Sequence, residues 1–457
     1  MTISEKVVIP ASTGIQNARN GLEAGDSGSN PEWLNRIYSF LRTRQRNVFQ
    51  QAPKKEVKAM KRYALVFFCV LFTMGLLLTG ASPAAAVKVG IVLPLTGAEA
   101  KFGEIEKRSF EMAVDEINKK GGVKGQKIEL LIEDDTGRPD VGRSVAEKLI
   151  NKDKVVMLGG GYSSSVTYAV AGVAQQNRIP FLVNTGSADN ITTSGWDYIF
   201  RLNPPVSEYA GAIESLLTEV VKPQTIVILH ENSLFGTSGA KSFEATCNKL
   251  GYKVLLKQGY EAGGIDFKPV LVRVKQLNPD VVYMISYIMD ASLLMKQAKE
   301  LKLTPKIFIG GAAGFTMPEF QKNAGIASEK VISATLWYQS LKYPGAMDYF
   351  KKYVAKYKSE TEYHGAEAYA AAYVIADTLK RAKSFSSADI KQSLSATDMM
   401  TVFGPVKFIS YGKFKNQNKL TTYVVQWIDG RLELVWPANI ATKKFVYPVD
   451  WLKTWKY

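Results

Sequence analysis

The residues whose types and spacing could support chemistry lie at 158–168, in the stretch LGGGYSSSVTY, directly after an apolar run. Three glycines and three serines at the end of a strand can cradle a phosphate, present a nucleophile or hold a carboxylate. A Walker phosphate loop needs Gly-Lys-Ser/Thr, but Gly161 is followed by Tyr and Ser. The dinucleotide pattern G-x-G-x-x-G fails at Ser164, and the nucleophile elbow G-x-S-x-G lacks its final glycine.

Partners for a catalytic serine or a metal ion are few in this sequence. Its two histidines, His230 and His364, stand far apart and outside any known ligand spacing. Cys69 and Cys247 are the two cysteines, and only Cys247 lies outside the N-terminal apolar stretch. We therefore expect no enzymatic step, no metal site and no cofactor.

A serine-rich strand end can bind an anion without reacting with it. The first N–H groups of a helix have no partner within the helix and carry partial positive charge. A carboxylate placed there gains charge-assisted hydrogen bonds from N–H and hydroxyl groups without a basic side chain. The alternative is that Ser163, Ser164 and Ser165 only cap the helix expected at 164–176.

The charge of the chain does not indicate a nucleic-acid partner. The 457 residues contain 58 Lys and Arg against 42 Asp and Glu, a net charge of +16. The basic residues are spread along amphipathic segments, and no zinc-finger or RNP motif is present. We interpret this excess as solvated lysine faces.

The N-terminal part of the chain is expected to be an export signal with an upstream extension. Residues 60–62, Met-Lys-Arg, precede an apolar core of 15 residues at 64–78 and an Ala-Ala-Ala site at 84–86. We predict a signal peptide at 60–86 and a mature, periplasmic or extracytoplasmic chain from Val87. A membrane anchor is the alternative, but the apolar run is short for a span of about 20 residues. Residues 1–59 are expected to be untranslated or disordered.

Alternation of apolar strands with amphipathic helices predicts an α/β fold. One series begins at 87–95 and continues through helix 103–122 and the strands 127–134 and 155–160. A second series of the same kind starts at 225–231. We therefore predict two doubly wound parallel-sheet lobes with a crevice between them. The tail after 404 alternates apolar and polar residues around an Asp-Gly turn at 429–430, which predicts antiparallel strands attached to one of the lobes.

The order of segments resembles the periplasmic binding proteins for branched-chain amino acids and related amides, which feed ABC transporters. The resemblance covers residues 87–430 and includes VKVGIVLPLTGAEAKFGEIEKRSFEMAVDEINKKGG, GGGYSSSVTYAVAGVAQQNRIPFLVNTGS and GPVKFISYGKF. It implies two lobes joined by three crossovers, a small-molecule ligand, ABC permease subunits as partners, a monomer and no enzymatic activity. We expect 87–205 plus 338–404 in lobe 1, and 206–337 plus 405–457 in lobe 2.

The resemblance also implies roles for particular side chains. Ser163 would bind the ligand carboxylate, while Thr185, Gly186 and Ser187 would contact the same end of the ligand. The ligand's side group would pack against aromatic residues of both lobes, namely Phe102, Tyr162, Phe235 and Tyr287.

One departure from the family pattern leaves the ligand open. Amino-acid-binding members place an acidic residue after the strand at 306–310, but this chain has Ala312 there. A buried ammonium without a partner is costly. Either Asp290 or Glu367 replaces the missing acid, or the ligand is a carboxylate or amide without an amine; Asp290 as a helix cap is the alternative for that residue. A sensory protein that signals to a membrane receptor is the alternative function, and an enzyme using Ser163 or His364 is the least favoured one.

Overall fold

The computed structural model describes Ser39 and residues 85–456. The chain divides into two compact units, Met1–Ser82 and Pro83–Tyr457, and the fold below is that of the second unit. The expected extension at 1–59 and nearly all of the expected signal at 60–86 lie outside the described residues. Among the described helices, none has the length and apolar character needed to cross a membrane.

The first lobe is built on a seven-stranded sheet with strand order β13-β14-β5-β4-β3-β1-β2. The five strands that come from residues 87–201 run parallel to one another. The strands are β1 (Val87–Leu93), β2 (Ile128–Asp134), β3 (Met157–Gly160), β4 (Phe181–Val183), β5 (Ile199–Arg201), β13 (Ile409–Tyr411) and β14 (Phe414–Gln417).

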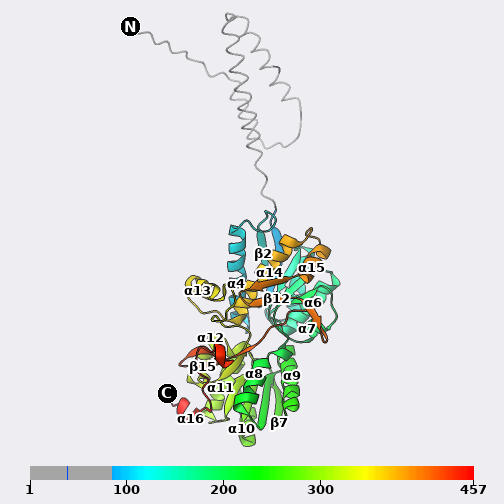
Figure 1. Cartoon of the computed structure of the whole chain (residues 1–457). Coiled ribbons are helices and arrows are strands. Elements are labelled where there is room, and N and C mark those ends of the chain that lie inside the picture. The colour runs from blue at the N-terminus through cyan, green and yellow to red at the C-terminus, as the bar shows by residue number, and fades with distance from the viewer. Residues whose placement is uncertain (1–38, 40–84, 457) are drawn as a thin grey trace, which may run out of the picture. The chain divides into compact units, whose positions relative to one another are not determined.

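Helices cover both faces of this sheet, as expected where parallel strands are buried on both sides. The longest two, α4 (Ala100–Lys119) and α14 (Tyr363–Arg381), pack against each other. The others are α5 (Pro139–Asn151), α6 (Ser164–Gln176), α7 (Asn190–Thr193), α13 (Ala346–Tyr357) and α15 (Ser387–Ser395), together with the hairpin β11 (Asp398–Thr401) and β12 (Gly404–Lys407). Figure 1 labels α4, α6, α14 and α15 in the first lobe; of these, α4 contacts β2, whereas α6 contacts β4 and β5.

The second lobe repeats the architecture with the order β16-β15-β10-β9-β8-β6-β7. Its strands are β6 (Thr225–Glu231), β7 (Lys253–Tyr260), β8 (Val281–Ile285), β9 (Ile307–Gly310), β10 (Ile332–Thr335), β15 (Tyr423–Ile428) and β16 (Arg431–Trp436). Its helices are α8 (Gly211–Leu216), the π-helical turn η2 (Leu217–Val221), α9 (Leu234–Leu250), α10 (Lys268–Leu277), α11 (Ile288–Glu300), α12 (Pro318–Ala324) and α16 (Trp451–Thr454). Short 3₁₀ turns complete both lobes: η1 (Val206–Glu208), η3 (Ala313–Phe315), η4 (Gly325–Ser328) and η5 (Ala438–Ile440).

The two-lobe α/β prediction is confirmed, but one expected boundary is wrong. Residues 405–457 were all expected in the second lobe, as a tail attached to one sheet. Strand β14 instead pairs in parallel with β5 of the first sheet, through Gln417 and Arg201. Only β15 and β16 join the second sheet, with β15 antiparallel to β10. The chain therefore returns to the second lobe after residue 417, because each hairpin completes the open edge of a different sheet.

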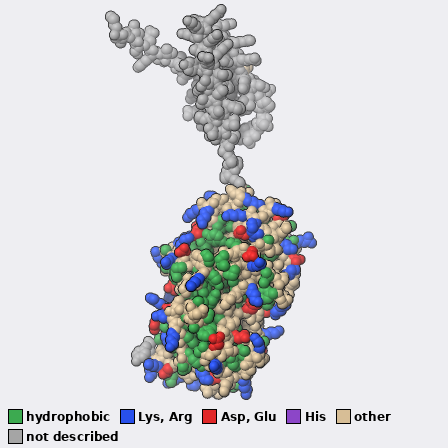
Figure 2. All heavy atoms as spheres, in the orientation of Figure 1, with side chains coloured by type: hydrophobic (Ala, Val, Ile, Leu, Met, Phe, Trp, Pro, Cys, Tyr) green, Lys and Arg blue, Asp and Glu red, His purple; other side chains and the backbone are tan. Residues whose placement is uncertain are grey.

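Charged side chains cover the surface without forming a continuous basic face. Figure 2 shows Lys and Arg scattered among acidic and neutral side chains over the visible side of the lobes. Many of these cations are paired locally, as in the exposed pairs Lys101–Glu104 and Lys407–Asp398. Such exposed pairs contribute little to stability, about 0–1 kcal/mol each.

Candidate ligand-binding site

The ends of parallel strands from both lobes converge on one cleft. In open α/β sheets, ligands bind outside the carboxyl ends of the strands, where loops lead into helices. Here the residues after β3 and β4 face those after β6 and β8. The cleft encloses a cavity of about 20 Å³, room for about one water molecule. Its lining is Tyr162, Ser164, Thr185, Ser187, Tyr209, Phe235, Tyr287, Ala313, Tyr363 and His364.

The aromatic side chains expected at the ligand lie together in this cleft. Phe102 stacks on Tyr162 with ring centroids 4.4 Å apart, and Tyr162 lies 6.0 Å from Tyr287 of the other lobe. Phe235 lies 5.7 Å from Tyr287. Phe102 also meets the edge of His364 at 4.9 Å. The rings of both lobes thus form one cluster that fills most of the cleft and would pack against an apolar ligand group.

The glycines of the opening motif allow a backbone conformation that other residues rarely adopt. Gly160 and Gly161 have φ angles of +95° and +88°, which L side chains rarely adopt. A Cβ on Gly160 would lie 2.5 Å from the carbonyl oxygen of Val92. This turn directs the chain from the end of β3 to Ser163, immediately before α6.

Ser163 does not act as a side-chain cap of α6. It occupies the N-cap position, but its hydroxyl makes no capping hydrogen bond to the helix. The Tyr287 hydroxyl of the other lobe lies close enough for the Ser163 hydroxyl to lower its pKa in part. Burial, with the nearby carboxyls of Glu99 and Glu231, raises the pKa of Tyr287 well above its ordinary value, so this phenol stays neutral. The Ser163 hydroxyl makes no capping hydrogen bond within α6, and Ser163 is not among the residues that line the cavity.

The loop after β4 is tied to the first turn of α6. The Ser164 hydroxyl accepts hydrogen bonds from the N–H groups of Ser187 and Ala188, each at 3.1 Å. The Gly186 N–H donates to the Gly161 carbonyl at 2.7 Å, and a Cβ on Gly186 would lie 2.5 Å from the Thr167 hydroxyl. Only glycine therefore allows the two loops to approach this closely.

A buried guanidinium lies behind the same loop. Arg201 is fully buried and donates to the Ala188 carbonyl at 2.8 Å, to Thr192 at 2.8 Å and to Gln417 at 2.7 Å. Burial lowers its pKa to about 10, so it stays protonated at neutral pH. No described carboxylate forms an ion pair with it. The wall at residues 186–188 therefore has a positive charge behind it, which favours an anion in the cleft.

Two buried carboxyls flank the Thr185 hydroxyl. Glu106 of α4 and Glu367 of α14 lie 2.8 Å and 2.9 Å from its oxygen. Burial raises the pKa of Glu106 to about 8 and that of Glu367 well above its ordinary value. Asn184 donates from its amide to Glu106 at 2.7 Å and to Thr185 at 2.8 Å. The Thr185 hydroxyl is thus fully engaged and faces the acids, although the residue lines the cavity.

A second group of acids lies between the lobes, beside the aromatic cluster. Burial and the carboxyls of Asp135 and Glu231 raise the pKa of Glu99 to about 8. Burial likewise raises the pKa of Asp135 to about 6. Glu231 accepts hydrogen bonds from Ser233 and from the N–H of Gly236 at the start of α9. Among the described residues, no group of His, Cys, Asp and Glu could hold a metal ion.

The candidates for a replacement acid differ in position. Asp290 lies in the first turn of α11 and accepts the Gly263 N–H at 3.0 Å, and it is not among the residues that line the cavity. It is not the cap of that helix either, because Tyr287 holds the N-cap position. Ala312 is fully buried beside the cleft, with φ of 70° and ψ of −147°. Of the two proposed acids, only Glu367 lies next to a lining residue.

Sequence reasoning missed several residues of this site. Tyr209, Tyr363 and His364 line the cavity, and Glu106 and Arg201 lie directly behind it. No local motif marks them. Tyr363 and His364 begin α14, about 200 residues after Ser163, so only the packing of α14 against α4 brings them to the cleft.

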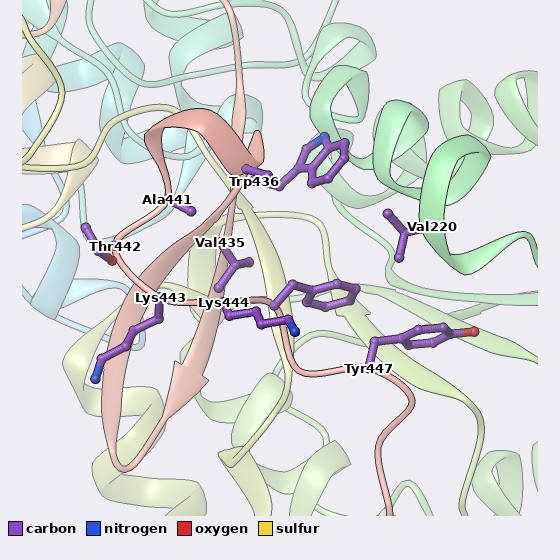
Figure 3. Close-up of a pocket in the computed structure, with 10 residues that line it drawn as sticks. Val220, Val435, Trp436, Ala441, Thr442, Lys443, Lys444 and Tyr447 are labelled. Atoms are coloured by element: carbon purple, nitrogen blue, oxygen red, sulfur yellow. The ribbon is translucent and has the colours of Figure 1, made fainter.

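A larger hollow of about 550 Å³ lies elsewhere on the second lobe. Figure 3 shows Val220, Trp436, Lys444 and Tyr447 around it, beneath the C-terminal segment. Figure 3 shows Lys443 pointing away from the other lining side chains and Lys444 extending toward them, and none of the residues expected to bind a ligand lines the hollow. The cleft, where polar and aromatic groups of both lobes converge, is therefore the better candidate site despite its smaller volume.

These features define a two-lobed binding protein whose cleft lies between similar α/β halves. The chain matches the model of the periplasmic binding protein family over residues 86–431, and it belongs to that family. It is 30% identical over 400 residues to Leu/Ile/Val-binding protein homolog 7 of Brucella melitensis, covering 83% of this chain and 98% of the relative. It is also 30% identical over 377 residues to homolog 8 from the same organism, covering 79% and 93%.

Solved structures share the fold. The leucine-binding protein LivK of Thermotoga maritima matches with a TM-score of 0.71 and 22% identity, over 76% of this chain and 97% of that one. LivJ of Streptococcus pneumoniae, in complex with isoleucine, matches with 0.70 and 25% identity, over 77% and 99%. A solute-binding protein of R. palustris in complex with benzoate matches with 0.69 and 20% identity, over 80% and 99%. The resemblance to branched-chain amino acid-binding proteins is thereby confirmed.

Proposed function

We propose that this protein captures a small carboxylate-bearing ligand in the interlobe cleft and delivers it to the permease subunits of an ABC importer. The single observation that carries the proposal is the contact between Tyr162 and Tyr287 across the cleft, with ring centroids 6.0 Å apart. Tyr162 directly precedes the N-cap residue of α6 in the first lobe, and Tyr287 is the N-cap residue of α11 in the second. A ligand held there would contact both lobes at once.

The carboxylate of the ligand would lie at the N-terminus of α6. The partial positive charge of the helix and the Ser163 hydroxyl provide hydrogen-bond donors at that point. Arg201, behind the loop of Ser187 and Ala188, adds a full positive charge without touching the ligand. Its burial keeps it out of water, so its field is screened less than that of a surface arginine.

The remainder of the ligand would pack among aromatic rings. Phe102, Tyr162, Phe235 and Tyr287 supply apolar faces from both lobes. Burying one apolar group of Leu or Phe size contributes about 1.5–3 kcal/mol. Together with a few charge-assisted hydrogen bonds of about 1.5–3 kcal/mol each, this can reach the roughly −8 kcal/mol of micromolar affinity.

Ligand capture would be coupled to closure of the lobes. Several contacts already join them: the Ala313 N–H donates to the Tyr363 hydroxyl at 2.9 Å, and Thr316 lies 3.2 Å from Glu362. We expect these contacts to break when the cleft opens. The closed form would be the shape that the permease recognises, as in hinge-closing binding proteins generally. The expected signal peptide at 60–86 would export the chain to the compartment where it works.

Two ligand classes fit the relatives. The structural neighbours include one with isoleucine and one with benzoate. In this chain Ala312 and Ala313 stand beside the cleft, and neither can pair with an ammonium. A carboxylate with an apolar or aromatic side group and no amine fits this wall better than an amino acid.

The test is a thermal-shift screen of the purified protein against aliphatic and aromatic carboxylates, amino acids and small amides, followed by calorimetry of the hits. We expect a carboxylate to raise the melting temperature and to bind saturably with one site per chain. The proposal fails if no member of any class binds. It also fails if turnover of an ester or amide accompanies binding.

A further inference from the structure

In the cluster of Glu106, Thr185 and Glu367, a single hydroxyl lies between two carboxyl groups. All three side chains are buried, with Glu106 and Glu367 fully so. Glu106 comes from α4, Thr185 from the end of β4 and Glu367 from α14. The Thr185 oxygen has both carboxyls within hydrogen-bond distance, at 2.8 Å and 2.9 Å, and the Asn184 amide at 2.8 Å.

Counting protons resolves this arrangement. A hydroxyl has one proton, so Thr185 can donate to only one of the two carboxyls. The other carboxyl must then donate a proton of its own to the Thr185 oxygen. The requirement holds for either orientation of the Asn184 amide, because that group brings no second hydroxyl proton. At least one of Glu106 and Glu367 is therefore a neutral carboxylic acid.

The contacts of the two acids indicate that Glu367 holds the proton more firmly. Glu106 has two partners, accepting from Asn184 with one oxygen and meeting Thr185 with the other. Glu367 meets Thr185 with one oxygen, while its Oε1 is buried without a partner in the described chain. A buried carboxylate with an unpaired oxygen is far more costly than a buried carboxylic acid.

One cation, Arg201, lies behind the same loop and donates to the Gly186 carbonyl at 3.4 Å, but no described hydrogen bond or ion pair joins it to either acid. The charged or titratable groups that act on the two acids are the carboxyls of Asp135 and Glu362 and the phenols of Tyr162, Tyr209 and Tyr363. His364, one turn before Glu367 on α14, is bonded to Glu362 at 2.7 Å. Burial raises the pKa of Glu106 to about 8, and burial together with Glu106 raises that of Glu367 further.

The cluster lies one layer behind the cleft. Thr185 lines the cavity, whereas Glu106 and Glu367 do not. Because the Thr185 hydroxyl is bonded to the acids and to Asn184, it offers the ligand no free donor. The acids can therefore affect the ligand through their charge, without touching it.

We propose that Glu106 and Glu367 hold a proton behind the first-lobe wall of the cleft, keep that wall free of negative charge, and thereby select anionic ligands that carry no ammonium group. This inference rests on the proposed function and specifies its ligand class. Glu106 and Glu367 act as positioning residues, since Thr185 separates them from the ligand. Ionisation of the cluster would place a negative charge beside the ligand carboxylate and oppose its binding.

The stored proton can be tested without any ligand. A protonated carboxyl has a carbonyl stretching band that a carboxylate lacks, and infrared difference spectra between the protein and its variants report it. We expect a buried-carboxyl band at neutral pH that the double variant Glu106→Gln/Glu367→Gln removes. The variant Glu104→Gln is the matched control, because Glu104 lies on the same helix, is exposed and forms surface ion pairs. A wild-type protein without this band overturns the proposal.

The charge effect is tested by calorimetry with a carboxylate that binds in the screen. We expect its affinity to be constant near neutral pH and to fall above about pH 8, approaching a tenfold loss per pH unit if the ionised cluster excludes the ligand. In the double Gln variant, which is neutral at every pH, the affinity should no longer fall as the pH rises. The control Glu104→Gln should follow the wild-type profile.

The outcomes separate this inference from the proposed function. If no compound binds to wild type or variants, the proposed function fails, while the infrared band still decides whether the proton is present. If an amino acid binds, and the double Gln variant loses that binding at neutral pH, the acids pair with an ammonium and the inference is wrong. If the Gln variant unfolds, the single variant Glu367→Gln, whose amide can donate to Thr185, replaces it in the same titration.

Discussion

Replacing Ser163 with alanine separates a ligand-binding serine from a helix-capping one. A serine that caps a helix contributes about 1 kcal/mol to stability, which its loss would remove. The Ser163 hydroxyl makes no such capping bond, so Ser163→Ala should leave the free energy of unfolding nearly unchanged. The same hydroxyl would donate to the ligand carboxylate, and loss of a hydrogen bond to a charged group costs about 1.5–3 kcal/mol.

The expected weakening is therefore about 10-fold to 150-fold in dissociation constant, since each 1.4 kcal/mol is a factor of about ten. Calorimetry with a carboxylate from the screen measures it, and urea unfolding measures stability. Ser144→Ala is the control, because the Ser144 hydroxyl is exposed and bonded only to the Asp140 carbonyl of its own helix. Unchanged affinity would remove Ser163 from the site. A loss of about 1 kcal/mol in stability with unchanged affinity would instead support the capping role.

Three further predictions concern stability. Tyr162→Phe should keep or raise the melting temperature, because its buried hydroxyl has no partner in the described chain, and a marked fall would contradict this. Ala312→Gly should stabilise the protein by roughly 1 kcal/mol in chemical denaturation, because its positive φ favours glycine; destabilisation would refute the strain. For Glu106, whose pKa rises from 4.5 unfolded to about 8 folded, the folded state binds the extra proton. The free energy of unfolding should therefore fall by about 1.4 kcal/mol per pH unit as the pH rises between these two values. Glu106→Gln should flatten that slope in pH-dependent unfolding.

Much of the fold could be predicted from the sequence because its signals are local. Strands such as 87–93 and helices such as 100–119 follow from apolar periodicity and from glycines that end the helices. Which sheet the strands at 409–417 join could not be predicted in this way. A hairpin pattern indicates antiparallel pairing, but which sheet edge it completes depends on partners about 200 residues away, such as Arg201.

The residues of the candidate site could likewise be predicted from the sequence only in part. The residues that follow strands, such as Ser187 and Tyr287, could be named from position and family resemblance, and both line the cavity, whereas Ser163 does not. Glu106 gave no signal, because an acid within a charged helical segment is typical of a solvent-facing residue. Its burial results from the packing of α4 on α14, which only the tertiary structure reveals. Asp290 was named from sequence, but its carboxyl binds the Gly263 N–H away from the cavity lining.

The alanine at position 312, where amino-acid-binding members have an acid, can be interpreted together with the buried acids that the sequence alone could not place. Its side chain offers no partner for an ammonium, and Glu367 lies behind Thr185 instead of in the cavity wall. On one side of the cleft lie a buried guanidinium, a helix N-terminus and the acid pair that we propose to hold a proton. All three features favour a negatively charged ligand without a compensating positive group.

The most direct measurement of this account compares three compounds that differ only at one end: a carboxylic acid, the corresponding α-amino acid and the corresponding amide, each titrated into the purified protein by calorimetry. The account predicts saturable binding of the carboxylate with an affinity near micromolar, and binding of the amino acid and the amide at least about tenfold weaker. Tighter binding of the α-amino acid than of the plain carboxylate would contradict it.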